Sequence, residues 1–163
     1  MTASKVRELF EKGTDAFNRH DAEGFAETMA DDVRTRAPGI GEIAGKQAVK
    51  AFYKSWIDAF PDARVEITAA QFLEDMSVEE GVFTGTHRGT LRSPSGELPP
   101  TGRTVRVEYM QVARYRGDKT ASLHLVFDQL ELMAQLGLVP QAAASEAPSF
   151  RPGEAAGESL QTH

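Results

Sequence analysis

The chain has 163 residues, of which 24 are acidic and 18 are basic, and it contains no cysteine. This length fits one domain that can bury a core without disulfides or a structural metal. The lack of cysteine excludes zinc–thiolate sites, iron–sulfur clusters and a cysteine nucleophile. The net charge of -6 argues against nucleic-acid binding, because phosphate recognition needs a cationic surface.

No stretch of sequence approaches the roughly 20 apolar residues that a membrane-spanning helix needs. The first residues lack the apolar core of a signal peptide and run directly into a helical pattern. We therefore expect no membrane partner and a cytoplasmic location.

Apolar residues at helical spacing predict helices in the first third of the chain. The first helix begins at an N-cap, Ser4. A second, short helix is capped by Asp21 and extends to Val33. A third follows Gly45 and ends before Pro61, because proline cannot continue a helix.

Alternating apolar residues predict strands over 33–37, 64–73, 78–91, 104–116 and 119–127, and a short helix over 129–136. Three prolines and two glycines make 92–102 a loop. Glycines recur every four residues at Gly81, Gly85 and Gly89, which indicates strong bending or close backbone approach.

Helices followed by antiparallel strands predict an α+β domain over residues 1–139, with helices on one face of a bent sheet. The concavity of such a sheet is a natural site for a small molecule. Residues 140–163 are rich in Ala, Glu, Ser, Pro and Gly, so we expect a flexible tail there.

The last strand has one apolar face and one polar face, and the polar face carries His124 and Asp128. This polar face meets either water or a cavity. The two residues are about 13 Å apart along the strand, so they would flank a substrate rather than contact each other. In an apolar pocket a carboxylate becomes a stronger base, and an imidazole can stabilise an oxyanion.

Each candidate residue also has a structural interpretation. Asp128 precedes the final helix and could cap it, and His124 could be a surface residue. His87 lies between glycines, which leave room for a ligand or a bulky neighbour, but it could also form hydrogen bonds across the sheet. Arg114 and Glu108 could form an exposed pair. The four histidines lack metal-ligand spacing, so we expect no metal site.

Four segments carry a resemblance to a known family: residues 17–21, 60–62, 85–89 with 99–103, and 128–137. The last of these, DQLELMAQLG, is the most specific. Together they span most of residues 5–139. On these segments the chain resembles the SnoaL-like polyketide cyclase (ester cyclase) family of the NTF2-like superfamily.

The resemblance implies an NTF2-like cone, in which a strongly curved, mostly antiparallel sheet and N-terminal helices enclose a pocket. It also implies an intramolecular aldol condensation without metal or organic cofactor, in which an Asp at the position of Asp128 acts as general base. The sequence departs from the family at Ser122-Leu123-His124, where Glu-His-Trp is common, and Arg114 aligns with a family histidine. Family members often form homodimers through the outer face of the sheet.

We therefore expect a cofactor-independent cyclase that acts on a small hydrophobic, carbonyl-bearing molecule of polyketide type. Asp128 is the expected base, and His124 is the expected acid or oxyanion partner. The expected substrate contacts are His87, Arg114 and Glu108 as polar groups and Tyr53, Trp56, Met110 and Val112 as apolar walls. The alternatives are epoxide-opening cyclisation, dehydration or isomerisation on the same fold, and a non-catalytic module for binding or dimerisation.

Overall fold

The computed structural model describes residues 1–93 and 96–139. The expected tail over 140–163 lies outside the described residues. In chain order the elements are α1 (Ala3–Asn18), α2 (Ala22–Glu27), β1 (Met29–Ala37), β2 (Gly41–Ala44), α3 (Lys46–Ala59), β3 (Arg64–Phe72), β4 (Met76–Thr86), β5 (Leu91–Ser93), β6 (Gly96–Leu98), β7 (Thr104–Arg116), β8 (Lys119–Phe127) and α4 (Gln129–Gln135).

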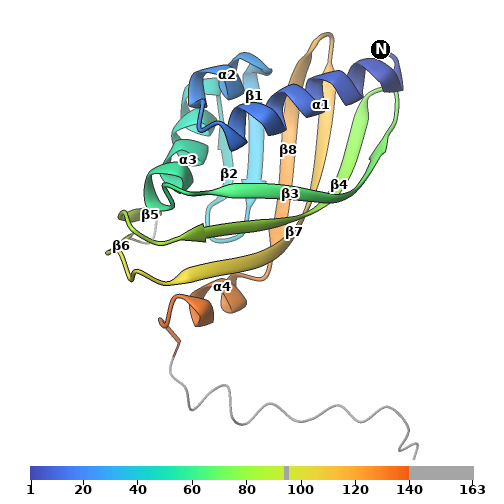
Figure 1. Cartoon of the computed structure of the whole chain (residues 1–163). Coiled ribbons are helices and arrows are strands. Elements are labelled where there is room, and N and C mark those ends of the chain that lie inside the picture. Colours follow the sequence, from blue (N-terminus) through green and yellow to red (C-terminus); the bar gives the residue numbers. More distant parts are fainter. Residues whose placement is uncertain (94–95, 140–163) are drawn as a thin grey trace, which may run out of the picture.

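The main sheet has six strands in the order β2-β1-β8-β7-β4-β3. The β1–β8 pair is parallel, and the other neighbouring pairs are antiparallel. Strands β5 and β6 form a separate antiparallel pair. Figure 1 shows the sheet bending strongly, with α1, α2 and α3 on one side of it. The predicted α+β class with a curved sheet is confirmed.

The helices cover the sheet because each has one apolar side. In α1 the residues at helical spacing, including Val6, Leu9 and Phe17, are buried, and in α3 Val49 and Tyr53 are buried. These side chains meet strand residues in one hydrophobic core. Apolar burial of this kind supplies most of the stability of such helices, which are too short to be stable alone.

Two predicted helix boundaries are wrong. The N-cap of α1 is Thr2, whose hydroxyl accepts a hydrogen bond from the Lys5 amide at 3.2 Å, and Ser4 lies within the helix. The second helix, capped by Asp21 as predicted, ends at Glu27 rather than Val33. Residues 29–37 instead form β1, because pairing with both β2 and β8 outweighs the helical spacing.

The turn between α1 and α2 is attached to β3 by side chains. Asn18 accepts from the Val65 amide at 2.8 Å and donates to the Val65 carbonyl at 3.0 Å. His20, with φ of 59°, places its Nε2 2.7 Å from the Ala63 carbonyl. These contacts fix where α1 crosses the sheet and therefore where its inner residues face the core.

The regularly spaced glycines of β4 and the following loop permit close packing. A Cβ at Gly85 would lie 2.9 Å from the Cβ of Phe60, and one at Gly89 would collide with the Asp58 carbonyl. Arg88 and Gly89 both donate backbone hydrogen bonds to the Ala59 carbonyl at 3.0 Å. The space beside Gly85 and Gly89 is thus occupied by the end of α3 and by Phe60, which follows it.

Within the described residues, no helix is long and apolar enough to cross a membrane.

Candidate active site

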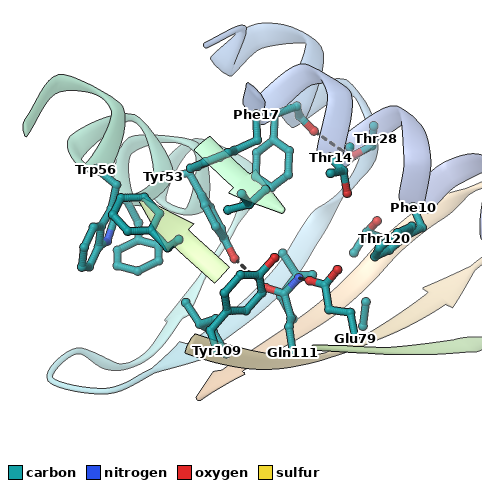
Figure 2. Close-up of a pocket in the computed structure, with 18 of the residues that line it drawn as sticks. Phe10, Thr14, Phe17, Thr28, Tyr53, Trp56, Glu79, Tyr109, Gln111 and Thr120 are labelled. Carbon is teal, nitrogen blue, oxygen red and sulfur yellow. Dashed lines mark hydrogen bonds between the residues drawn. The ribbon is translucent and has the colours of Figure 1, made fainter. Parts of the chain in front are cut away.

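A cavity lies between the concave face of the sheet and the helices, and Figure 2 shows its lining side chains. Its volume is about 130 Å³, which gives room for a small ring system. Residues from α1, α3, β4, β7 and β8 line it, and Leu132 of α4 adds to the wall. Most of these residues are apolar, with a few polar groups among them, as is usual for small-molecule sites.

One part of the cavity wall is built from aromatic rings around Trp56. The Trp56 ring contacts Phe83 edge-on at a centroid distance of 5.6 Å and Phe127 at 5.9 Å. Phe52 also contacts it edge-on at 6.5 Å, and Phe60, behind the wall, stacks on it at 5.9 Å with an interplanar angle of 14°. This cluster offers a flat, apolar surface to a ligand.

Glu79 of β4 is a carboxylic acid in this apolar cavity. Its residue surface is only 5% exposed. Burial raises the pKa of Glu79 from 4.5 to about 7, while the hydrogen bond from Gln111 acts in the opposite direction. Near neutral pH the group therefore exists in both the protonated and the ionised form.

A chain of hydrogen bonds orients the Glu79 carboxyl group (Figure 2). The Tyr53 hydroxyl donates to Oε1 of Gln111 at 3.2 Å, and Nε2 of Gln111 donates to Oε1 of Glu79 at 2.7 Å. Because the Tyr53 phenol occupies the amide oxygen, the amide nitrogen faces the carboxyl group. The other oxygen, Oε2 of Glu79, is buried and has no hydrogen-bond partner among the described residues.

Hydroxyl groups line the part of the cavity beyond Glu79. Tyr115 and Ser77 form a buried hydrogen bond of 3.0 Å between their hydroxyls. Thr120 also faces the cavity, although alternation along β8 from Leu123 would place it outside. A shift in the β7–β8 register, which pairs Tyr115 with Thr120, reverses the alternation there.

Asp128 does not line the cavity, and the prediction that it does is wrong. Strand β8 ends at Phe127, whose ring faces the cavity, so the next side chain lies outside. Asp128 is exposed and caps α4, where its Oδ1 accepts from the Glu131 amide at 3.0 Å. The catalytic role predicted for Asp128 thus loses its geometric basis.

His124 also lies on the opposite face of the sheet from the cavity. Its Nδ1 is 3.2 Å from a guanidinium nitrogen of Arg36. The cavity face of β8 is the apolar one, with Leu123, Leu125 and Phe127. The concave face carries apolar residues because the helices cover it, whereas the polar face looks outward.

The predicted contacts from β7 share this outward placement. None of Glu108, Met110, Val112 and Arg114 lines the cavity. Met110 is 50% exposed. The residues that alternate with them, Tyr109 among them, face inward.

His87 is fully buried but is not a cavity residue. Its ring stacks on Phe60 at 5.2 Å, and its Nδ1 accepts from the Thr101 amide at 3.3 Å. Burial lowers the pKa of His87, so its neutral form is favoured. His87 therefore joins α3 to the loop before β7 rather than contacting a substrate.

Two of the predicted contacts, Tyr53 and Trp56, do line the cavity. The polar residues of the site, Glu79, Tyr109 and Gln111, were missed by the sequence analysis. The alternation of side chains along β4 could have identified Glu79. Every second residue of a strand points to the same face, so Glu79 lies on the same buried face as Phe83 and Gly85.

Among the described residues no group of His, Asp and Glu side chains could hold a metal ion.

The sequence model of the SnoaL-like polyketide cyclase family matches residues 7–136. Among curated proteins there is no significant sequence match.

Solved structures share the fold at low sequence identity. A candidate SnoaL-like polyketide cyclase from Jannaschia sp. CCS1 is 18% identical, with a TM-score of 0.74 over 84% of this chain and 94% of that one. AclR, a candidate hydroxylase from Streptomyces galilaeus, is 24% identical, with a TM-score of 0.71 over 86% and 100%. TsrD from Streptomyces laurentii is 20% identical, with a TM-score of 0.73 over 85% and 99%. These similarities concern the fold.

Proposed function

Because the chain belongs to the SnoaL-like polyketide cyclase family, we propose that it closes a ring in a small hydrophobic, carbonyl-bearing molecule of polyketide type. Proton transfer in the cavity is the task of Glu79. One observation carries this proposal. Oε2 of Glu79 is buried in an apolar cavity and has no hydrogen-bond partner among the described residues. The proposal includes no metal or organic cofactor.

Glu79 suits acid–base catalysis for a physical reason. Its pKa of about 7 lies close to neutral pH, where a group can both accept and return a proton. Gln111 occupies Oε1, which leaves Oε2 as the atom that meets the substrate. Tyr53 acts through Gln111 and is therefore a positioning residue.

The reaction is an intramolecular aldol addition. The Glu79 carboxylate removes a proton from a carbon next to a carbonyl group, and the resulting enolate attacks a second carbonyl carbon of the same molecule. A carbon–carbon bond forms and the π bond of the second carbonyl breaks. Its oxygen takes the proton back from the Glu79 carboxylic acid, so the enzyme returns to its starting state.

The aromatic wall around Trp56 suits an apolar, flat part of the substrate, because ring contacts of this kind bury area in preferred geometries. Exclusion of water from the same space keeps the carboxyl pKa high and protects the enolate from bulk solvent. The substrate therefore enters with its reactive carbonyl toward Glu79 and its apolar part toward Trp56.

Epoxide-opening cyclisation, dehydration and isomerisation could use the same carboxyl group, and the product distinguishes them from an aldol reaction. A non-catalytic binding module predicts ligand binding without proton exchange. A homodimer through the outer face of the sheet and a cytoplasmic location stay predictions.

The experiment measures deuterium exchange at the α-carbon of β-tetralone in D₂O by NMR. This exchange is the first half of an aldol reaction, and it needs no knowledge of the natural substrate. Glu79→Gln should lower the protein-dependent rate by about 100-fold or more, the usual contribution of a general base. The wild-type rate should rise with pH through about 7, where the carboxyl group ionises.

Two variants serve as controls. Glu80→Gln changes the next residue of β4, which is exposed, and should keep the wild-type rate. Asp128→Asn should also keep it, because Asp128 lies outside the cavity. Full activity in Glu79→Gln, or a loss confined to Asp128→Asn, would overturn the assignment. No protein-dependent exchange in the wild type would favour the binding module.

A further inference from the structure

We propose that Tyr109 is a second catalytic residue, which donates a hydrogen bond to the substrate oxygen that becomes negatively charged as Glu79 removes the proton. This inference rests on the proposed function of the same cavity. It goes further by naming the group that stabilises the enolate.

The three tyrosines of the chain all line the cavity, and their hydroxyls differ in one respect. The Tyr53 hydroxyl donates to Gln111, and the Tyr115 hydroxyl is bonded to Ser77. Among the described residues, the Tyr109 hydroxyl has no hydrogen-bond partner. Tyr109 is therefore the phenol in this cavity whose donor is available to a ligand.

A glycine creates the place where this phenol lies. Tyr109 of β7 pairs directly with Gly81 of β4. A Cβ at Gly81 would lie 2.6 Å from both the Cζ and the hydroxyl oxygen of Tyr109. The ring thus lies over the bare backbone of Gly81, and any larger residue there would displace the hydroxyl.

The same pairing brings the hydroxyl close to the carboxyl group. Glu79 and Gly81 are successive inward-facing positions of β4, about 7 Å apart along the strand. Figure 2 shows Tyr109 and Glu79 on either side of Gln111, and the charge of Glu79 acts on the Tyr109 phenol. In a ketone only the carbonyl carbon separates the oxygen from the α-carbon. One ketone can therefore present its oxygen to Tyr109 and its α-proton to Glu79.

The protonation states of the two groups suit the reaction. Burial raises the pKa of Tyr109 well above its usual range, and the negative charge of Glu79 acts in the same direction. The phenol therefore stays protonated and donates. When Glu79 takes the α-proton, negative charge moves to the carbonyl oxygen, where the hydrogen bond from Tyr109 strengthens. No proton leaves Tyr109 in this step.

The test uses p-nitrophenol as the ligand. Its yellow anion carries a negative oxygen on a single ring and so imitates the oxygen of the enolate. The measurements use the Glu79→Gln variant. Its neutral amide imitates the neutral carboxylic acid that Glu79 becomes when it has taken the proton from the substrate. We expect this variant to bind the anion, seen as increased absorbance of the phenolate at neutral pH. Adding Tyr109→Phe should weaken binding of the anion by about tenfold or more, because an oxyanion donor is lost. Tyr115→Phe in the same background removes a phenol hydroxyl that is already bonded to Ser77, and should weaken binding of the anion less than Tyr109→Phe does.

Gly81→Ala supplies a second variant that displaces the Tyr109 hydroxyl without removing it, and it should also weaken binding of the anion. Equal affinity of the Glu79→Gln and Glu79→Gln/Tyr109→Phe proteins, or equal losses from Tyr109→Phe and Tyr115→Phe, would falsify the role of Tyr109. In wild-type background, Tyr109→Phe should slow β-tetralone exchange by about 100-fold without moving the pH midpoint near 7. If Glu79→Gln keeps full exchange activity, the proposed function fails, while the p-nitrophenol result still decides whether Tyr109 binds an oxyanion.

Discussion

Replacing Glu79 with glutamine should stabilise the protein at alkaline pH. Glu79 has a pKa of about 7 in the folded protein, against 4.5 for an ordinary glutamate. Between these two values the unfolded chain has lost the proton while the folded protein still holds it. Stability therefore falls as pH rises from about 4.5 to about 7, and it stays reduced above that range. Glutamine carries no charge and avoids this loss.

The magnitude follows from the pKa difference. One pKa unit corresponds to about 1.36 kcal/mol. The shift from 4.5 to about 7 thus costs the ionised folded protein about 3 kcal/mol at about pH 8, and less than about 1 kcal/mol at about pH 5. Because Glu79 is only 5% exposed, solvent screening does not reduce this cost substantially. For a chain of this size the difference corresponds to roughly 10 °C in melting temperature.

The assay is urea unfolding of the wild type, Glu79→Gln and Glu80→Gln at about pH 5 and about pH 8. The Glu79→Gln protein should gain about 3 kcal/mol over the wild type at the higher pH and little at the lower one. Glu80 is exposed, so Glu80→Gln should follow the wild type at both. Parallel pH dependence of Glu79→Gln and wild type would refute the argument that burial destabilises the charged carboxylate.

Two further substitutions test the packing that shapes the site. Asn18→Ala removes both hydrogen bonds to the Val65 backbone, and should lower the free energy of unfolding in urea by about 2 kcal/mol. A loss below about 0.5 kcal/mol would mean that water replaces these bonds. Gly89→Ala places a methyl group against the Asp58 carbonyl, and should lower the free energy of unfolding by about 3 kcal/mol or more, or prevent folding. Circular dichroism measures this effect, and a melting temperature equal to that of the wild type would contradict the close approach of the two backbones.

Much of the fold could be predicted from local patterns. The helix that ends before Pro61 and the long strands around Gly117 are marked by spacing and by residues with a fixed backbone preference. The stretch from Met29 to Val33 could not be assigned this way. Its helical spacing is overridden by pairing with β8 at both ends of this stretch, where Met29 meets Thr120 and Arg34 meets Ser122.

The site is harder to predict, because the His-bearing face of β8 suggests chemistry while the cavity lies on its apolar face. The faces of each strand follow from alternation, but which face is concave depends on where the helices pack. His124 lies on the outward face of β8, and Asp128, one residue beyond the end of that strand, caps α4. Glu79 is hard to recognise because it is followed directly by Glu80, and an acidic pair in a strand ordinarily marks the solvent side.

The aromatic cluster around Trp56 gives the protein an optical probe of its own. Trp56 is the single tryptophan of the chain, and its indole lines the cavity. Fluorescence excited at wavelengths longer than the tyrosine absorption band therefore comes from Trp56 alone, at the wall of the cavity. Occupancy can be followed by a change in fluorescence intensity or wavelength in unlabelled protein, which makes a library of small ketones and phenols practical to screen.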